Sequence, residues 1–263
     1  MTEKAEEDWM TVKVGIIGGS GLDEPDILKD ATRLETENLY GRPSSNLTCG
    51  RIGGVEVVIL ARHGRDHSIY PGAVNFRANI YALKEMGCTH ILAATAVGSL
   101  RREIEPGHLV LPSQFIDFTK RRENTFFDQG QVVHTPMAEP FCPNLRQLLL
   151  QQARALSLPC HADKTVITIE GPRFSTRAES HMFRSWQADV INMSTVPEVN
   201  LAREQKIHYA AVAMSTDYDC WHEDDEPVTW EMIMATMSKN AHNVIRLFTE
   251  TIPLIADYDD ICH

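Results

Sequence analysis

Short, nearly continuous apolar runs alternate with helix-forming segments along almost the whole chain. Such runs lack the polar–apolar alternation of a strand with one solvated face, so they are typical of a sheet that is covered on both faces. The pattern predicts an α/β fold, a single domain with a central mixed β-sheet flanked by helices. We expect strands at residues 13–17, 55–61, 90–95, 108–111, 165–170, 189–193 and 208–214.

Helical segments separate the expected strands. Pro143 and Pro197 each suit a first helical turn, where the missing N–H has no partner in any case. Residues 118–136 fit neither pattern and predict a long irregular loop, either functional or merely on the surface. We expect residues 1–11 to be a disordered tail and 12–263 to be the domain. The expected helices are 75–86, 143–156, 175–186, 197–205 and 228–249.

Charge and composition exclude several classes of protein. The 263 residues include 25 Lys and Arg against 36 Asp and Glu, a net charge of −11. A nucleic-acid binder instead needs a basic surface for the phosphates. No apolar run approaches the roughly 18 residues of a membrane span. The six cysteines form no C-x-x-C pair, and we expect no signal peptide, so we predict free, mostly buried thiols in the cytoplasm or also the nucleus.

A glycine-rich turn follows the first expected strand, with the sequence G-I-I-G-G-S-G at 15–21. Its backbone N–H groups can approach an anion, and Ser20 adds a hydroxyl. The spacing differs from the G-x-G-x-x-G of dinucleotide-binding folds. A phosphate loop and a plain tight turn are therefore both open interpretations.

Arginine and histidine crowd the end of the next apolar strand, in A-R-H-G-R-D-H at 61–67. Open α/β sheets bind ligands at the carboxyl ends of their strands, and an arginine such as Arg62 holds an oxyanion with two N–H groups. The cluster favours an anion site, although a solvated turn explains each histidine singly. Thr95 and Ala96 stand at the end of another expected strand and Ser194 follows a third, and these small or hydroxyl residues suit either an oxyanion or ordinary packing.

Carboxylates follow the last expected strand, in S-T-D-Y-D-C-W at 215–221. Asp217 and Asp219 can accept from an exocyclic amine or pass a proton to a leaving group. The alternatives are an Asp-rich turn or a metal site, for which this stretch offers few ligands. Glu170 and Phe174 form a further cluster after a strand, with a core phenylalanine as the default interpretation. Because all these clusters end strands, we expect one convergent site.

Six ordered motifs resemble those of the trimeric purine nucleoside phosphorylase superfamily, most closely its methylthioadenosine phosphorylase family. The resemblance runs from about residue 12 to 254. It implies that phosphate attacks C1′ of 5′-methylthioadenosine, which releases adenine and 5-methylthioribose 1-phosphate. It also implies a homotrimer and no metal or organic cofactor. The motifs are G-I-I-G-G-S-G-L, A-R-H-G-R, T-P-M-A-E-P-F-C-P, I-E-G-P-R-F-S-T-R-A-E-S, N-M-S-T-V-P-E-V and S-T-D-Y-D-C-W.

The resemblance further implies a role for each matched residue. Asp217 and Asp219 are the implied catalytic pair at the N7 and 6-amino edge of the base. Asp217 can donate only when protonated, so burial or Asp219 must raise its pKa. His134 is expected to reach the 5′ pocket of a neighbouring subunit. The implied phosphate ligands are Ser20, Arg62, His63, Thr95, the Ala96 backbone and Ser194. The implied nucleoside contacts also include Phe174, Ser175, Met193, Thr216, Tyr218, Trp230 and Ile233.

Some positions depart from the family pattern. Ser20 and Ser194 stand where the family usually has threonine, which keeps the hydroxyls, and Val97 replaces a cysteine. Trp230 replaces a small aliphatic residue of the 5′ pocket, unless it is a core aromatic of its helix. The loop before His134 also looks short. Two alternatives therefore stay open. One is a broader adenosine or purine nucleoside phosphorylase with an altered 5′ pocket, and the other is a nucleotide-binding module without catalysis.

Overall fold

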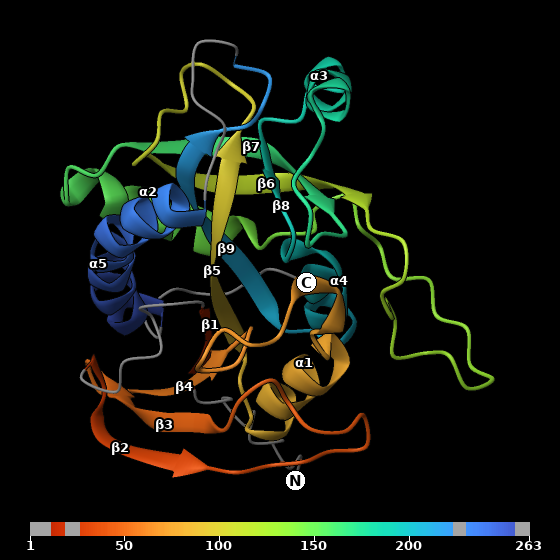
Figure 1. The fold of residues 1–263 in the computed structure, drawn as a ribbon. Coiled ribbons are helices and arrows are strands. Elements are labelled where there is room, and N and C mark those ends of the chain that lie inside the picture. The colour runs from red at the N-terminus through yellow and green to blue at the C-terminus, as the bar shows by residue number, and fades with distance from the viewer. Residues whose placement is uncertain (1–11, 19–26, 223–229, 256–263) are drawn as a thin grey trace, which may run out of the picture.

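A computed structural model shows one mixed β-sheet with helices on both of its faces (Figure 1). The structure describes residues 12–18, 27–222 and 230–255, without the side chains of 230–235, 238 and 239. The strands are β1 (Lys13–Gly18), β2 (Lys29–Leu34), β3 (Leu47–Ile52), β4 (Val55–Ala61), β5 (His90–Ser99), β6 (Leu109–Phe118), β7 (Cys160–Ile169), β8 (Val190–Asn192) and β9 (His208–Tyr218). The helices are α1 (Phe76–Glu85), α2 (Pro143–Ala155), α3 (Arg177–Ser185), α4 (Thr195–Glu204), α5 (Trp230–Ile255) and the short 3₁₀ helix η2 (Pro71–Ala73). The predicted fold class is confirmed.

The sheet has the strand order β2-β3-β4-β1-β5-β8-β7-β6-β9, and β9 pairs with β5 as well. Strands β5, β8, β7, β6 and β9 therefore close into a ring. The pairs β1–β4, β1–β5, β5–β9, β6–β7 and β7–β8 are parallel, and the others are antiparallel. The sequence pattern did not predict this closure, because periodicity says nothing about strand order.

Two layers of core explain why the strands read as continuous apolar runs. Helices α1 and α4 cover one face of the sheet and α2 and α5 the other (Figure 1). Neighbouring residues of β1 illustrate the consequence, since Ile17 packs in the first layer and Ile16 in the second, both without exposed surface. A strand buried on both sides needs apolar residues at every position.

Four strands extend several residues further than the sequence predicted, among them β7, which begins at Cys160 where residue 165 was predicted, and two others were not predicted. Strands β5 and β9 stay paired in parallel to Ser99 and Tyr218, with a register irregularity after Val97. Asp217 therefore lies inside β9, so its predicted place after a strand end was wrong. Thr95, predicted as the last residue of its strand, lies in the interior of β5. The prediction ended each strand at its last apolar residue, whereas the backbone pairing of β5 and β9 continues through the polar residues that follow. β6 likewise reaches Phe118, beyond the predicted end at residue 111. Strand β2 was missed because all of its residues are exposed, and β3 pairs with it.

The predicted helices agree with the observed ones within a few residues. The largest differences are at α4, which begins at Thr195 with a non-helical Val196, and at α5, which extends to Ile255. The predicted loop is also confirmed: residues 119–142 contain neither helix nor strand and lie between β6 and α2. Its first part is held to the body, since Phe126 is buried and its N–H donates to Glu204, and a further part of the loop extends outward (Figure 1). The domain boundaries stay a prediction, because residues 1–11 lie outside the described part. Of the free cysteines there, Cys88 and Cys142 are buried, and Cys49, Cys160 and Cys220 are half-buried.

Candidate active site

One cavity gathers side chains from β5, β9, α5 and the segments that follow β4, β7 and β8. The parallel register of β5 and β9 brings Gly98 opposite Asp217. Most of the residues that the sequence singled out thus lie around one space. The lining residues are Arg62, His63, His67, Ala94, Thr95, Ala96, Val97, Gly98, Ile169, Phe174, Ser175, Ile191, Asn192, Met193, Ser194, Met214, Thr216, Asp217, Asp219 and Met237.

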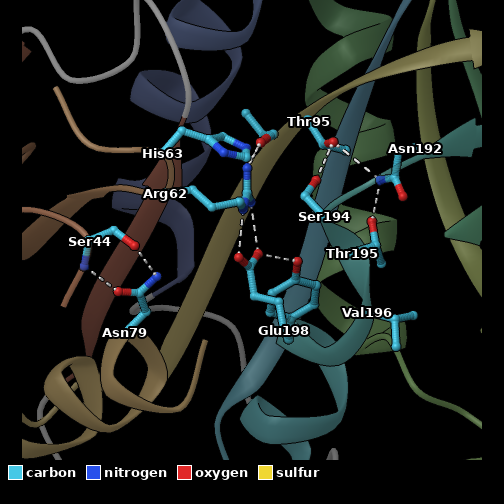
Figure 2. Close-up of polar contacts among 12 residues, drawn as sticks. Ser44, Arg62, His63, Asn79, Thr95, Asn192, Ser194, Thr195, Val196 and Glu198 are labelled. Carbon is cyan, nitrogen blue, oxygen red and sulfur yellow. Dashed lines mark hydrogen bonds and ion pairs between the residues drawn. The ribbon is translucent and has the colours of Figure 1, made fainter. Parts of the chain in front are cut away.

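Arg62 is a buried cation, and three of its N–H groups donate to protein acceptors. Its Nε and Nη2 donate to the two carboxylate oxygens of Glu198 at 2.7 and 2.8 Å, and its Nη1 donates to the carbonyl of Ala94 at 2.8 Å (Figure 2). The hydroxyl of Tyr209 donates to Glu198 at 2.7 Å. Burial alone would lower the pKa of Arg62, but the charge and hydrogen bonds of Glu198 outweigh it and raise that pKa. A guanidinium has five N–H groups, so two remain for a ligand.

His63 follows Arg62 and is held as one tautomer. Its Nδ1 lies 2.9 Å from the carbonyl oxygen of Ile69. A carbonyl can only accept, so Nδ1 must carry the hydrogen and donate it. Burial, followed by the charge of Arg62, lowers the pKa of His63 to about 4. The imidazole is therefore neutral near pH 7, and Nε2 carries a lone pair.

Hydroxyl groups lie across the cavity from Arg62 and His63 (Figure 2). The Thr95 and Ser194 oxygens are 2.8 Å apart, and the Asn192 side-chain amide donates to Thr95 at 3.2 Å and to Thr195 at 2.6 Å (Figure 2). All four side chains are buried. Asn192 thus orients hydroxyls that can donate to an oxyanion, a role that the sequence did not assign. Ser20 lies outside the described residues.

The two aspartates have different surroundings. Asp217 accepts a hydrogen bond from Thr216 at 2.6 Å. Burial raises the pKa of Asp217 to about 6. The hydrogen bond from Thr216 lowers this pKa, whereas the charge of Asp219 raises it. Asp219 accepts from the Ser175 hydroxyl at 2.7 Å to each of its oxygens. Gly98 makes room for this pair, because a Cβ there would lie 3.2 Å from an Asp217 oxygen. A carboxyl that is easily protonated thus lies beside one that is held as an acceptor.

Apolar side chains complete the wall between the hydroxyl and carboxyl ends. Phe174 is 48% exposed at the rim, so its default interpretation as a core residue was wrong. Met193 and Met237 line the cavity as well. A pocket with apolar walls and a few convergent polar groups is the usual form of a small-molecule site.

Some predicted residues do not line this cavity. His134 is exposed in the loop 119–142. Tyr218 is not among the lining residues, and its hydroxyl donates to the Arg102 carbonyl at 2.9 Å. Tyr218 stands between Asp217 and Asp219, which both line the cavity, so its side chain takes the other side of the backbone. The side chains of Trp230 and Ile233 lie outside the described residues.

Glu170 also lies outside the cavity, and its carboxylate anchors the start of the loop 119–142. It accepts from the backbone N–H of Lys120 at 2.6 Å and from the Arg122 guanidinium at 3.1 Å. The partner that a half-buried carboxylate requires is thus a structural one. In the described part of the chain, no cluster of three or more His, Cys, Asp or Glu suited to a metal ion is found. None of the described helices has the length and apolar character needed to cross a bilayer.

Relatives decide which family this site represents. The model of the phosphorylase superfamily matches residues 13–253. The chain is 54% identical to the S-methyl-5′-thioadenosine phosphorylases of Danio rerio and Xenopus tropicalis, over 94% of this chain and 90% of each relative. The chain belongs to the methylthioadenosine phosphorylase family. Among solved structures, this family's member from Schistosoma mansoni, in complex with adenine, has a TM-score of 0.91 at 43% identity and covers 95% of this chain and 93% of that one.

The family resemblance that the motifs indicated is therefore confirmed. Sequence reasoning nevertheless missed Glu198 and Tyr209, which hold Arg62 from α4 and β9. Glu198 stands inside the motif N-M-S-T-V-P-E-V, and a carboxylate among apolar residues was the available signal. Tyr209 gave none, because a tyrosine in an apolar strand is usually core.

Proposed function

We propose that the protein cleaves 5′-methylthioadenosine with phosphate, giving adenine and 5-methylthioribose 1-phosphate, without a metal or organic cofactor. The observation that carries this proposal is the pair of carboxyls at one end of a cavity whose other end holds oxyanion donors. Asp217 lies opposite Gly98 of β5, three residues further along that strand than Thr95, which contacts Ser194 and follows the Ala94 carbonyl that Arg62 binds. This arrangement suits a base and a phosphate on either side of a sugar.

In the proposed reaction, a phosphate oxygen bonds to C1′ of the ribose while the bond from C1′ to N9 of adenine breaks. The bonding electrons pass to the purine, and Asp217 donates its proton to N7. A sugar that is losing its base develops positive charge, which the phosphate anion stabilises and then captures. A donor with a pKa near 6 is suited to this step, because it is protonated often enough and still gives its proton up.

The other site residues are proposed in the roles that the family resemblance implies. Phosphate contacts the free N–H groups of Arg62, with His63 beside it. Met193 packs against the ribose, and Phe174 covers the base at the rim. The further proposed phosphate ligands are Ser20, Thr95, the backbone of Ala96 and Ser194. The further proposed nucleoside contacts are Ser175, Thr216, Trp230 and Ile233.

A spectrophotometric assay tests the reaction. The protein is given 5′-methylthioadenosine, adenosine and inosine, each with and without phosphate. We expect base release that requires phosphate, is fastest with methylthioadenosine and is slower with inosine by a factor of 100 or more, because Asp219 accepts from a 6-amino group and repels a 6-oxo group. Release without phosphate, or none from any nucleoside, contradicts the proposal.

A broader adenosine phosphorylase is the second candidate. A solved Schistosoma mansoni variant described as an adenosine/methylthioadenosine phosphorylase is 43% identical to this chain, with a TM-score of 0.90. Trp230 stands where the family usually has a small residue beside the 5′ group, and a bulky side chain favours the smaller 5′-hydroxyl. Adenosine equalling or exceeding methylthioadenosine in the assay decides for this candidate.

We further propose that the protein works as a homotrimer in the cytoplasm, with His134 serving a neighbouring site. Support comes from the loop 119–142, which extends from the body (Figure 1) and carries exposed apolar side chains beside His134. Val132 is 79% and Val133 39% exposed. Exposed apolar residues of such a loop gain free energy when a partner covers them.

A further inference from the structure

The oxyanion end of the cavity carries little net charge. Arg62 is 2% exposed and Glu198 is fully buried, and their two-point ion pair cancels the positive charge. Thr95 and Ser194 add neutral hydroxyls. An anion at this end is therefore bound mainly through hydrogen bonds. The pattern of donors and acceptors then decides which anion fits.

Among the residues at the oxyanion end, His63 supplies a nitrogen atom that can accept a hydrogen bond. Its Nδ1–H is committed to the Ile69 carbonyl at 2.9 Å, which leaves Nε2 for the cavity that the ring lines. The charged or titratable groups that face it are Arg62, His67, whose ring centroid is 4.8 Å away, and Arg122. All three disfavour a proton on the ring, and burial does so most.

We propose that Nε2 of His63 accepts the O–H of hydrogen phosphate and thereby makes the site selective for a protonated tetrahedral anion over sulfate. The proposal rests on the proposed function for the location of the phosphate. Sulfate has the same shape and charge as hydrogen phosphate near neutral pH, but it has no proton to give. It would set a lone pair against the lone pair of Nε2, unless His63 first took a proton from solvent.

Calorimetric titration of the wild-type protein with phosphate and with sulfate at pH 7.5, without nucleoside, measures this selectivity directly. We expect phosphate to bind at least about 100-fold more tightly, because a buried acceptor without its donor is costly. Titrations in buffers of different ionisation enthalpy report proton uptake. Sulfate binding is expected to take up about one proton per site at saturation. Phosphate binding is expected to take up none, and to release only the protons of the minor dihydrogen form that converts to hydrogen phosphate. Fluorophosphate, in which fluorine replaces the O–H, is expected to behave like sulfate.

The variant His63→Asn removes the acceptor and keeps an amide N–H for the Ile69 carbonyl. We expect it to reduce the preference for phosphate over sulfate to within about fivefold, whatever happens to the absolute affinity. The matched control is His181→Asn, which removes an exposed imidazole of α3 outside the cavity and is expected to keep the preference. If His63→Asn does not fold, proton uptake by the wild-type protein decides.

Equal binding of the two anions, sulfate binding without proton uptake, or an unchanged preference in His63→Asn overturns the proposal. Absence of binding by both anions overturns it as well. These outcomes are independent of turnover. Selective phosphate binding without nucleoside cleavage supports the role of His63 and rejects the proposed function. Phosphate-dependent cleavage without anion selectivity does the reverse.

Discussion

At the scale of single residues, Asp217 is the group whose surroundings most change its chemistry. Burial raises its pKa from 3.8 to about 6, with the nearby Asp219 adding to the shift. The folded state therefore holds the proton more strongly than the unfolded chain. The resulting loss of stability is complete above about pH 6 and disappears as the pH falls toward 3.8. A functional carboxyl here costs stability at neutral pH.

Replacing Asp217 with asparagine removes that cost and keeps an acceptor for Thr216. The free energy of unfolding is expected to increase by about 2–3 kcal/mol at pH 7.5 and to change little at pH 4. Urea denaturation at the two pH values measures this. We expect kcat for methylthioadenosine to fall at least about 100-fold in the same variant, because its proton donor is lost. A variant that is less stable at pH 7.5 contradicts the account.

Asp219 is expected to determine which base is accepted. Its two oxygens are oriented by the Ser175 hydroxyl. The variant Asp219→Asn presents an amide donor to a 6-oxo group, so the ratio of kcat/KM for adenosine over inosine is expected to fall by about 100-fold. Ser175→Ala is the matched control, because it loosens Asp219 without adding a donor. It should slow adenosine cleavage and leave inosine a poor substrate.

At the scale of secondary-structure elements, Arg62 is where several of them meet. The residue follows β4, its carbonyl partner Ala94 lies in β5, and Glu198 and Tyr209 come from α4 and β9. A guanidinium bound in this way cannot turn toward another partner. The elements around the cavity therefore fix the direction of the two remaining N–H groups.

Removing a partner of Arg62 should weaken both the fold and phosphate use. Tyr209→Phe removes one of the two donors to Glu198 Oε1, which keeps its bond from Arg62 Nη2. Because this hydrogen bond is made to a buried charged group, we expect a loss of about 1–3 kcal/mol in unfolding free energy. Glu198→Ala leaves a buried cation without a counter-charge, with an expected loss of about 3–5 kcal/mol. KM for phosphate should increase in Tyr209→Phe while KM for the nucleoside stays within twofold.

A suitable control for these variants is Ser44→Ala. Ser44 accepts a 3.0 Å hydrogen bond from the Asn79 side chain away from the cavity (Figure 2). The variant Ser44→Ala should lower the free energy of unfolding by about as much as Tyr209→Phe does, without affecting KM for phosphate. Equal increases of both KM values in Tyr209→Phe would show general loosening of the site in place of a directed effect on phosphate.

At the scale of the whole molecule, the loop 119–142 is bonded to the body along its first part and carries exposed residues further along the chain. Arg122 ties the base to the body through Glu170 at 3.1 Å and the Val196 carbonyl at 2.6 Å. The same loop carries His134 with Val132 and Val133, all three exposed. Such a loop is suited to reach a second copy of the chain, because anchoring it loses little further entropy on association.

Sedimentation equilibrium is expected to give a mass three times that of one chain. In the variant Val132→Asp, a charge in the loop 119–142 should weaken the assembly, which lowers the mass at micromolar concentration. His134→Ala is the comparison: we expect it to keep the mass and to reduce kcat/KM for methylthioadenosine more than for adenosine. A monomer that is fully active contradicts the proposed assembly.

The local pattern of the sequence was sufficient for the fold class and for most of the residues around the cavity. Apolar runs identified seven of the strands because burial on both faces leaves a signal at every position. Motifs identified Arg62, Thr95 and Asp217 because rare polar groups stand out against such runs. The exposed strand β2 gave no such signal.

Other features depend on distances that a linear pattern does not contain. Ring closure of the sheet through β5 and β9, the pairing of Arg62 with Glu198, and the tautomer of His63 each join residues through space. The sequence by itself determined which chemical groups are present and which segments are buried, since composition and periodicity are local. Only the tertiary structure decided their charge states and hydrogen-bonding directions, because burial and neighbouring charges arise when distant segments pack together.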